Sequence, residues 1–211
     1  MFTKRNLVAL IVCALALTAW AGSASAVIIT NGGFETGVFT PWTDGAAAPG
    51  TTTVVSGDAY EGTYACQFSQ KQDGGASIYQ FSTIAAGENL TFSFATKRVS
   101  GPLYTELEVM LRADDGAGHY AQLIPAYSAF AGTDSYVKYT YNVTVPTDYA
   151  YNNLFTYIGL GLDRPIDPDR TGIFSVYLVD AINVAVPEPS AVALLAVGLS
   201  GLLGCGWRKR N

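Results

Sequence analysis

The chain has 211 residues, a formal net charge of −5 at pH 7 and 49% hydrophobic residues. Residues 27–190 carry all seventeen Asp and Glu but only seven of the twelve Lys and Arg, so this segment is strongly acidic. Such a charge repels phosphates and excludes DNA or RNA as a partner, whereas it suits divalent cations or neutral polymers.

The first 26 residues predict a secretory signal peptide. Lys4 and Arg5 form its basic start, and Leu7–Leu17 form its apolar core. The small residues Ala24 and Ala26 mark a cleavage site, and we place the cut after Ala26. The alternative is an uncleaved anchor, for which the apolar core is short. We therefore expect the rest of the chain to be exported.

Residues 27–185 show almost no helical periodicity. Turn-forming residues recur between short β-rich runs, in several of which apolar and polar residues alternate, as Leu90, Phe92 and Phe94 do with their neighbours. This period of two predicts antiparallel strands packed as a sandwich, and the lack of an internal repeat favours a jelly roll. The predicted strands are Thr51–Val55, Tyr64–Phe68, Ser77–Phe81, Leu90–Thr96, Thr105–Arg112, Tyr120–Ile124, Tyr136–Val145, Leu154–Leu162 and Ile173–Val184.

Both ends of this segment carry a family resemblance. Residues 28–37 read IITNGGFETG and are followed by Phe39 and Trp42, while residues 179–184 read VDAINV. These stretches resemble the first and last strands of galactose-binding-like jelly rolls, which include several carbohydrate-binding modules. Residues 61–65 resemble a turn that enters a core strand of the same fold.

Asp180 stands where a charge is unfavourable. It shares the parity of apolar residues in the last predicted strand, so we expect it to face the core, where an unpaired carboxylate costs several kcal/mol or more. In the resembled fold a structural calcium lies where the first and last strands meet. The resemblance implies Glu35 and Asp180 as its carboxylate ligands, with carbonyls of Gly33 and Thr63 among the remaining oxygens. The alternative is that Asp180 caps a backbone amide at a bulge while Glu35 is exposed.

No catalytic constellation is found. The single histidine, His119, lies among glycines, which is typical of a solvated turn, and no nucleophile elbow, zinc motif or phosphate loop is present. Glu106 and Glu108 share one face of a predicted strand, opposite Leu107 and Val109, so we expect both glutamates to face solvent.

Cys66 is the only cysteine of the predicted domain, because Cys13 lies in the signal peptide and Cys205 in the apolar C-terminal run. An intramolecular disulfide is therefore excluded within the domain. A small buried core residue is favoured over a reactive thiol.

Sugar binding requires exposed aromatic side chains. Trp42 is the only tryptophan of the domain, and its neighbours favour a packing role. Better candidates are the tyrosines in or beside predicted loops. These are Tyr104, Tyr120, Tyr127, Tyr149 and Tyr151. The alternative is that the tyrosines close the edges of the sandwich, and the sequence does not separate the two interpretations.

The last 26 residues, 186–211, form a three-part tail. Residues 186–190 contain Pro187 and Pro189 and predict a stiff, extended spacer. Residues 191–207 are uncharged and, as a helix, would cover about 26 Å, enough for a thin bilayer. Arg208, Lys209 and Arg210 would then remain in the cytoplasm. The alternative is a buried core helix.

The order of Pro187, Glu188 and Pro189, an apolar segment and a basic end resembles the PEP-CTERM sorting signal of Gram-negative bacteria that make extracellular polysaccharide. The resemblance implies recognition of the tripeptide by an exosortase, a membrane-embedded cysteine transpeptidase. It also implies an exported protein that is anchored in the inner membrane during sorting and then resides in the cell envelope or extracellular matrix.

The sequence thus predicts an all-β protein, an antiparallel β-sandwich of jelly-roll topology over residues 27–185. A signal peptide precedes it and a single C-terminal transmembrane helix follows it. We expect a non-catalytic protein that binds or structures polysaccharide. The alternatives are a divergent glycan hydrolase or lyase, and a purely structural or adhesive surface protein.

Overall fold

The computed structural model describes residues 25–70, 74–101, 106–125, 128–131, 133–160 and 175–187, without the side chains of residues 25–27, 106 and 128–131. Within these ranges the chain forms strands and no helix. The strands form two antiparallel sheets within the compact unit Val27–Val186. The predicted all-β, two-sheet antiparallel sandwich is therefore confirmed.

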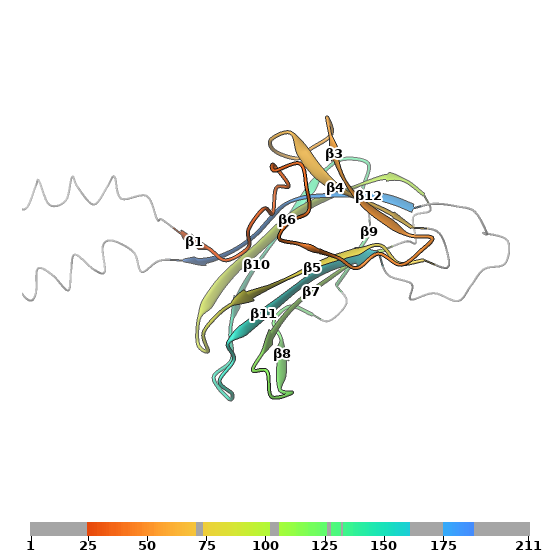
Figure 1. Ribbon diagram of the computed structural model, residues 1–211. Coiled ribbons are helices and arrows are strands. Elements are labelled where there is room, and N and C mark those ends of the chain that lie inside the picture. The colour runs from red at the N-terminus through yellow and green to blue at the C-terminus, as the bar shows by residue number, and fades with distance from the viewer. Residues whose placement is uncertain are drawn as a thin grey trace, which may run out of the picture. The chain divides into compact units, whose positions relative to one another are not determined.

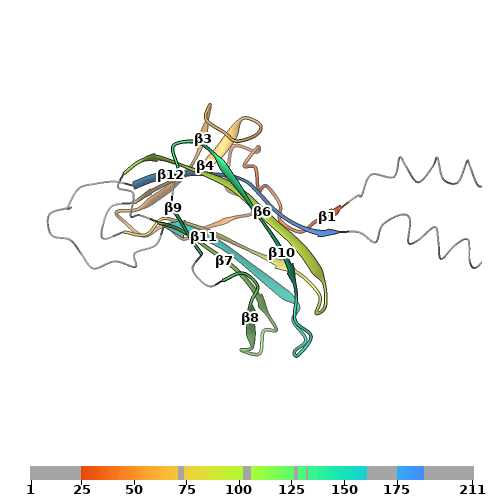
Figure 2. The same cartoon turned by 180° about the vertical axis from the view of Figure 1, so that it is seen from behind.

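Sheet A has the strand order β10-β6-β12-β4-β3, and β1 pairs with β12 outside this path. Sheet B has the order β2-β5-β11-β7-β8, and β9 pairs with β7. Figure 1 shows the two sheets as separate layers, and Figure 2 shows β10 beside β6 at one edge of sheet A. The strands are β1 (Ser25–Val27), β2 (Thr43–Asp44), β3 (Thr51–Ser56), β4 (Tyr64–Gln70), β5 (Ser77–Thr83), β6 (Asn89–Ser100), β7 (Glu106–Asp114), β8 (Tyr120–Gln122), β9 (Ser128–Ala131), β10 (Val137–Thr144), β11 (Asn153–Leu160) and β12 (Ser175–Pro187).

Each predicted strand overlaps one observed strand, which shows that period-two alternation located them correctly. The sequence missed β1, β2 and β9, which have two to four residues each. Two to four residues are too few to show an alternation of apolar and polar side chains. These short strands depend on pairing with a neighbouring strand for their extended conformation.

The hydrophobic core lies between the two sheets and is built by alternation along each strand. In β6, for example, Leu90, Phe92 and Phe94 are buried, and the rings of Phe92 and Phe94 stack on Tyr141 and Tyr139 of β10 at centroid distances of 6.3 Å and 5.3 Å. Facing sheets of a sandwich interdigitate such side chains. Among the largest fully buried side chains are Phe34, Phe68, Phe92, Phe94, Leu107, Leu111, Leu154 and Ile158.

The segment before β2 also contributes to the core. Trp42 is 4% exposed, packs on Phe34 at 6.2 Å and donates its indole Nε1–H to the carbonyl of Asn31. The Asn31 side chain in turn donates to the carbonyls of Val38 and Thr40, which shapes this loop. The packing role predicted for Trp42 is confirmed.

Cys66 is fully buried, and the lack of solvation raises the pKa of its thiol, with a smaller contribution from the charge of Asp44. A thiol with a raised pKa stays protonated and unreactive. The interpretation of Cys66 as a core residue is confirmed.

β12 contains a β-bulge directly after Asp180. The register with β6 shifts between Asp180 and Asn183, so Ala181 and Ile182 together oppose a single residue. Ala181 has a φ of 51°, in the left-handed region that non-glycine residues seldom enter.

The bulge changes which side of β12 faces the core. Tyr177 and Val179 belong to the core before it, and Ile182 and Val184 belong to the core after it. The prediction that Asp180 shares the core-facing parity is wrong, because one inserted residue inverts the alternation. Asp180 is nevertheless fully buried, on the opposite side of the strand.

Two phenylalanines on strands allow a matched test of this core. Phe92→Ala should lower the free energy of unfolding by about 3–5 kcal/mol, because it leaves a cavity between the sheets. Phe81→Ala, at a position 61% exposed, should lower it by less than about 1 kcal/mol. Urea unfolding of both variants measures the difference, and equal losses would contradict the core described above.

Candidate carbohydrate-binding site

The outer face of sheet B carries a group of aromatic side chains that the core does not use. In β5 and β11 the core-facing residues alternate with Tyr79, Phe81, Phe155 and Tyr157, which are half-buried or exposed. We call these four residues the aromatic face. Because alternation forces one set inward and the other outward, the same pattern that fills the core produces this face.

Strand register brings the four rings together. Phe155 lies opposite Phe81 and Tyr157 lies opposite Tyr79. The ring centroids are 5.0 Å apart for Phe81 and Phe155, 5.8 Å for Tyr79 and Phe155, and 6.3 Å for Phe155 and Tyr157. Rings at such distances support one another and form a continuous apolar surface.

Arg112 of β7 extends the aromatic face on the side away from β5. Its guanidinium carbon lies 5.0 Å from the ring centre of Phe155 and 5.2 Å from that of Tyr120. Cation–π contacts of this kind hold the guanidinium plane in position. Asp114 Oδ2 lies 3.9 Å from a terminal guanidinium nitrogen of Arg112 and balances part of the positive charge of Arg112.

Two buried donors beside these rings lack an acceptor within the described part of the chain. They are Arg112 Nε and Gln122 Nε2, and the two residues are register partners on β7 and β8. A buried donor without a partner costs about 1–3 kcal/mol. An acceptor such as a water or a ligand hydroxyl would remove this cost.

The tyrosines predicted as sugar-binding candidates differ in how exposed they are. Tyr120 is 64% exposed and joins the aromatic face through Arg112, whereas Tyr149 is exposed on the loop before β11 and stacks on His119 at 4.0 Å. Tyr151 is 3% exposed and belongs to the core, so it is not on the surface, and that prediction was wrong. Tyr104 and Tyr127 lie outside the described residues.

The two described side chains that could act in catalysis, Glu108 and His119, lie near the start of β7 and in the turn after its end. His119 Nδ1 lies 2.7 Å from Asp115 Oδ2 within the same turn. Glu108 is half-buried on the outer side of β7, while Leu107 and Val109 are buried, as predicted. The side chain of Glu106 is outside the described part.

Asp180 and Glu35 both bind the loop between β3 and β4, residues 57–63. Asp180 Oδ2 accepts from the backbone N–H groups of Tyr60 and Glu61, at 2.8 Å and 3.0 Å, and Oδ1 accepts from that of Ala181. Burial raises the pKa of Asp180, and the three amide hydrogen bonds oppose the rise.

Glu35 is exposed, and its carboxylate accepts from the backbone N–H groups of Thr63 and Tyr64. A Cβ added at Gly33 would lie 3.8 Å from Asp180 Oδ1 and 3.8 Å from Glu35 Cγ, so both acidic side chains border this glycine. Amide capping by Asp180 at a bulge, with Glu35 exposed, is the arrangement that the sequence left as the alternative to calcium binding. The two arrangements do not exclude each other, since a carboxylate oxygen has two lone pairs.

The predicted sorting segment begins inside the fold. Its first residue, Val186, is a half-buried strand residue of β12, and Pro187 is exposed at the end of this strand. Ala26 lies in β1, whereas Ala24, Glu188, Pro189 and the basic residues 208–210 lie outside the described residues. The described residues include no helix long and apolar enough to cross a membrane, and the predicted span 191–207 is not among them.

Over residues 26–163, more than half of its length, the chain matches the family described as a carbohydrate binding domain. The chain belongs to this carbohydrate-binding domain family. Residues 185–210 match the PEP-CTERM protein-sorting motif. Both resemblances noted in the sequence are thereby confirmed.

Solved structures show the same fold. A Family 16 Carbohydrate Binding Module-2 superposes with a TM-score of 0.56 at 19% identity, covering 74% of this chain and 98% of the module. TmCBM61 in complex with beta-1,4-galactotriose gives 0.52 at 20% identity, covering 76% and 98%. The CBM22-1 xylan-binding domain from Paenibacillus barcinonensis Xyn10C gives 0.50 at 20% identity, covering 80% and 99%. No curated protein matches the chain.

The aromatic face of this carbohydrate-binding domain was missed from the sequence, although a signal was present. Two predicted strands carry aromatic residues at the positions that alternate with the core, Tyr79 and Phe81 in one and Phe155 and Tyr157 in the other. The other parity of each strand also carries apolar residues, Ile78 in one and Leu154 and Ile158 in the other, so the sequence leaves open which set faces inward. Only the pairing of β5 with β11 shows that the four rings form one surface.

Proposed function

We propose that this domain binds a neutral polysaccharide chain along the outer face of sheet B. The observation that carries the proposal is the aromatic face itself, four rings in register that the core does not need. One side of a pyranose ring presents mainly C–H groups, which pack on flat aromatic surfaces, while its edges present hydroxyls that need polar partners. Arg112 and Gln122 supply such partners beside the rings.

The charges around the face favour a neutral ligand. Arg112 lies close to Asp114, and Glu108 lies on the same side of β7, so the face offers an anionic sugar no net positive charge. The acidic composition of residues 27–190 adds a repulsive field. The ligands named for two of the similar structures, xylan and beta-1,4-galactotriose, are also neutral chains.

Removing rings from the aromatic face should abolish most of the binding. For the full-length chain in detergent, we expect Phe155→Ala and Tyr157→Ala each to weaken binding about tenfold or more, the loss of a central aromatic contact. The measurement is isothermal titration with fragments of β-1,4-xylan, β-1,4-galactan, β-1,4-glucan, β-1,3-glucan and mannan, with oligogalacturonate as the anionic comparison.

Tyr60→Ala is the matched control, because Tyr60 is an exposed tyrosine on the β3–β4 loop, away from sheet B. It should leave affinity unchanged. Absence of binding by the wild-type chain to every neutral fragment would refute the proposal. Release of reducing sugar from the same fragments would instead identify a hydrolase. We expect no such release, because we propose that the domain only binds the glycan.

We further propose that a calcium ion stabilises the domain between Glu35 and Asp180. Asp180 is fully buried and has a raised pKa, so a nearby cation would favour its charged form. Asp180 Oδ1 and Glu35 Oε2 each accept one amide, which leaves each a lone pair for a metal. Within the described residues no three Asp, Glu, His or Cys side chains cluster, so carbonyls such as those of Gly33 and Thr63, with water, would supply the other ligands.

Thermal unfolding tests the calcium proposal. Millimolar calcium should raise the Tm of the wild-type chain by several degrees over its value in excess EGTA, because a ligand that binds only the folded state stabilises it. Asp180→Asn should remove this difference, whereas Asp58→Asn, in the same loop, should keep it. A wild-type Tm that is the same in calcium and in EGTA would exclude the ion and leave the amide hydrogen bonds as the sole compensation for Asp180.

For the two ends of the chain, we propose export followed by sorting. The signal peptide is removed after Ala26, and residues 191–207 hold the protein in the inner membrane with Arg208–Arg210 in the cytoplasm. An exosortase then recognises Pro187–Pro189 and releases the domain to the cell envelope or extracellular matrix. The sorting-motif match over residues 185–210 supports the sorting step. Sorting of this kind would bring the domain to extracellular polysaccharide.

Alanine at Pro187, Glu188 and Pro189 should trap the protein in the membrane fraction at its unprocessed mass, because the recognition tripeptide is gone. Fractionation and mass measurement of the C-terminus in the native host test this. Alanine at Thr53 and Thr140, two exposed strand residues of the domain, provides the control. Normal release of the tripeptide variant would contradict sorting through this motif.

A further inference from the structure

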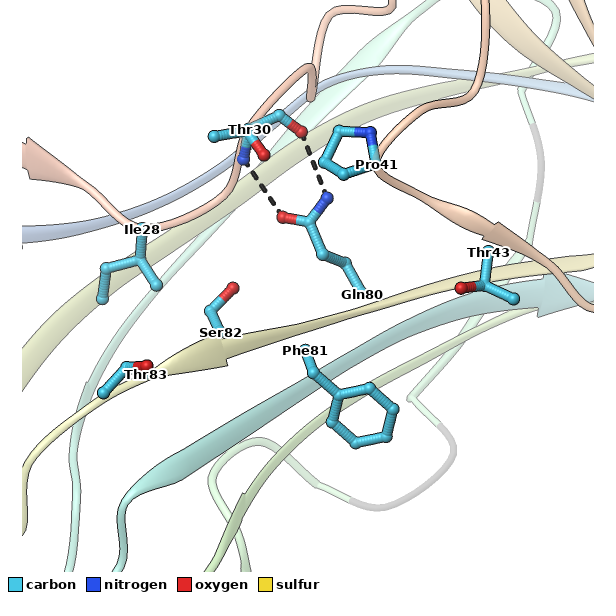
Figure 3. A pocket seen from close by; sticks show the side chains of 8 residues that line it. All are labelled: Ile28, Thr30, Pro41, Thr43, Gln80, Phe81, Ser82 and Thr83. Atoms are coloured by element: carbon cyan, nitrogen blue, oxygen red, sulfur yellow. Dashed lines mark hydrogen bonds between the residues drawn. The ribbon is translucent and has the colours of Figure 1, made fainter.

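An open groove of about 570 Å³ lies beside the aromatic face, between β5 and the segment that precedes β2. Figure 3 shows Gln80 reaching from β5 to Thr30, with the ring of Phe81 on the other side of the strand. The lining of the groove includes Thr30, Thr43, Gln80, Phe81, Ser82 and Thr83.

The groove exists because β2 is short. β2 pairs with β5 only at Tyr79 and Ile78. On the edge of β5 that faces away from β11, no described strand therefore pairs with residues 81–83. The side of the groove opposite β5 is held by two hydrogen bonds between Thr30 and Gln80. Thr30 N–H donates to Gln80 Oε1, and Gln80 Nε2 donates to the Thr30 carbonyl. This pair closes the edge of the sandwich and fixes the width of the groove.

The lining is rich in hydroxyl groups. Thr30, Thr43 and Thr83 are exposed, and Ser82 is partly exposed. Together with the unpaired edge of β5 they offer both donors and acceptors, while Phe81 offers an exposed ring. A sugar unit, with hydroxyls at its edge and C–H groups on its face, matches this combination.

The groove is continuous with the aromatic face through Phe81, which lines both. Phe81, Phe155, Arg112 and Gln122 are successive register partners on β5, β11, β7 and β8. At about 4.8 Å between strands this row is roughly 14 Å long and runs across the strands. A linear chain that follows the row past Phe81 enters the groove.

We propose that this groove is an end subsite that binds the sugar units of the glycan beyond Phe81, which makes the domain selective for longer chains. The inference rests on the proposed polysaccharide binding at the aromatic face. A peptide strand is the less favoured occupant, because the open edge of three residues is too short for stable strand addition.

A chain-length comparison tests the subsite with the full-length chain in detergent. The probes are the three-unit and six-unit oligomers of each neutral glycan in the binding panel. The wild-type chain should bind six units more tightly than three. The double variant Thr43→Val/Thr83→Val removes two groove hydroxyls without changing side-chain shape, and should weaken binding of six units about tenfold while leaving binding of three units unchanged.

Thr53→Val/Thr140→Val is the matched control, since it makes the same change at exposed threonines of β3 and β10 in sheet A. It should bind both lengths as the wild-type chain does. If the groove variant binds six units as well as the wild-type chain does, or loses affinity equally for both lengths, the end subsite is refuted while glycan binding stands. If the wild-type chain binds no oligomer, the proposed function fails and the subsite with it.

Discussion

The register that pairs β11 with β5 on one side and β7 on the other is the constraint on which both the core and the candidate site depend. It buries Leu154 and Ile158 and at the same time places Phe155 between Phe81 and Arg112. A shift by one residue would bring the aromatic residues into the core and expose the aliphatic ones. The energy that fixes the fold therefore also fixes the spacing of the rings. Ring positions set by strand pairing, as in the aromatic face, would lower the entropic cost of the proposed binding.

In sheet A, the buried carboxylate of Asp180 connects the β3–β4 loop to the last strand, β12, by hydrogen bonds. The bulge after Asp180 turns this side chain away from the core, and the amides of Tyr60 and Glu61 then meet it. Glu35 holds the other end of the same loop through Thr63 and Tyr64. The first segment of the domain, the β3–β4 loop and the last strand are thus joined at one point. The outer face of sheet B, where binding is proposed, lies on the other sheet and needs no part of this junction.

The position of the sorting motif links fold and delivery. The matched segment starts at Ala185, which is still a buried residue of β12. Very little chain separates the folded sandwich from the tripeptide that begins with Pro187. The aromatic face for which glycan binding is proposed lies on sheet B, which does not contain β12. The proposed processing at the tail and the proposed glycan binding therefore involve different segments of the chain.

The sequence by itself determined the all-β class, most strands and the buried roles of Trp42 and Cys66, because alternation, turn residues and side-chain size are local properties. It also carried the motifs at both ends of the domain. Only the tertiary structure decided on which side of β12 Asp180 lies, because a single bulge residue inverts every later position. It alone decided that Tyr151 is buried and that Tyr79, Phe81, Phe155 and Tyr157 share a surface. Those outcomes depend on which strands pair and in what register, and residues seventy or more positions apart in the chain do not encode that locally.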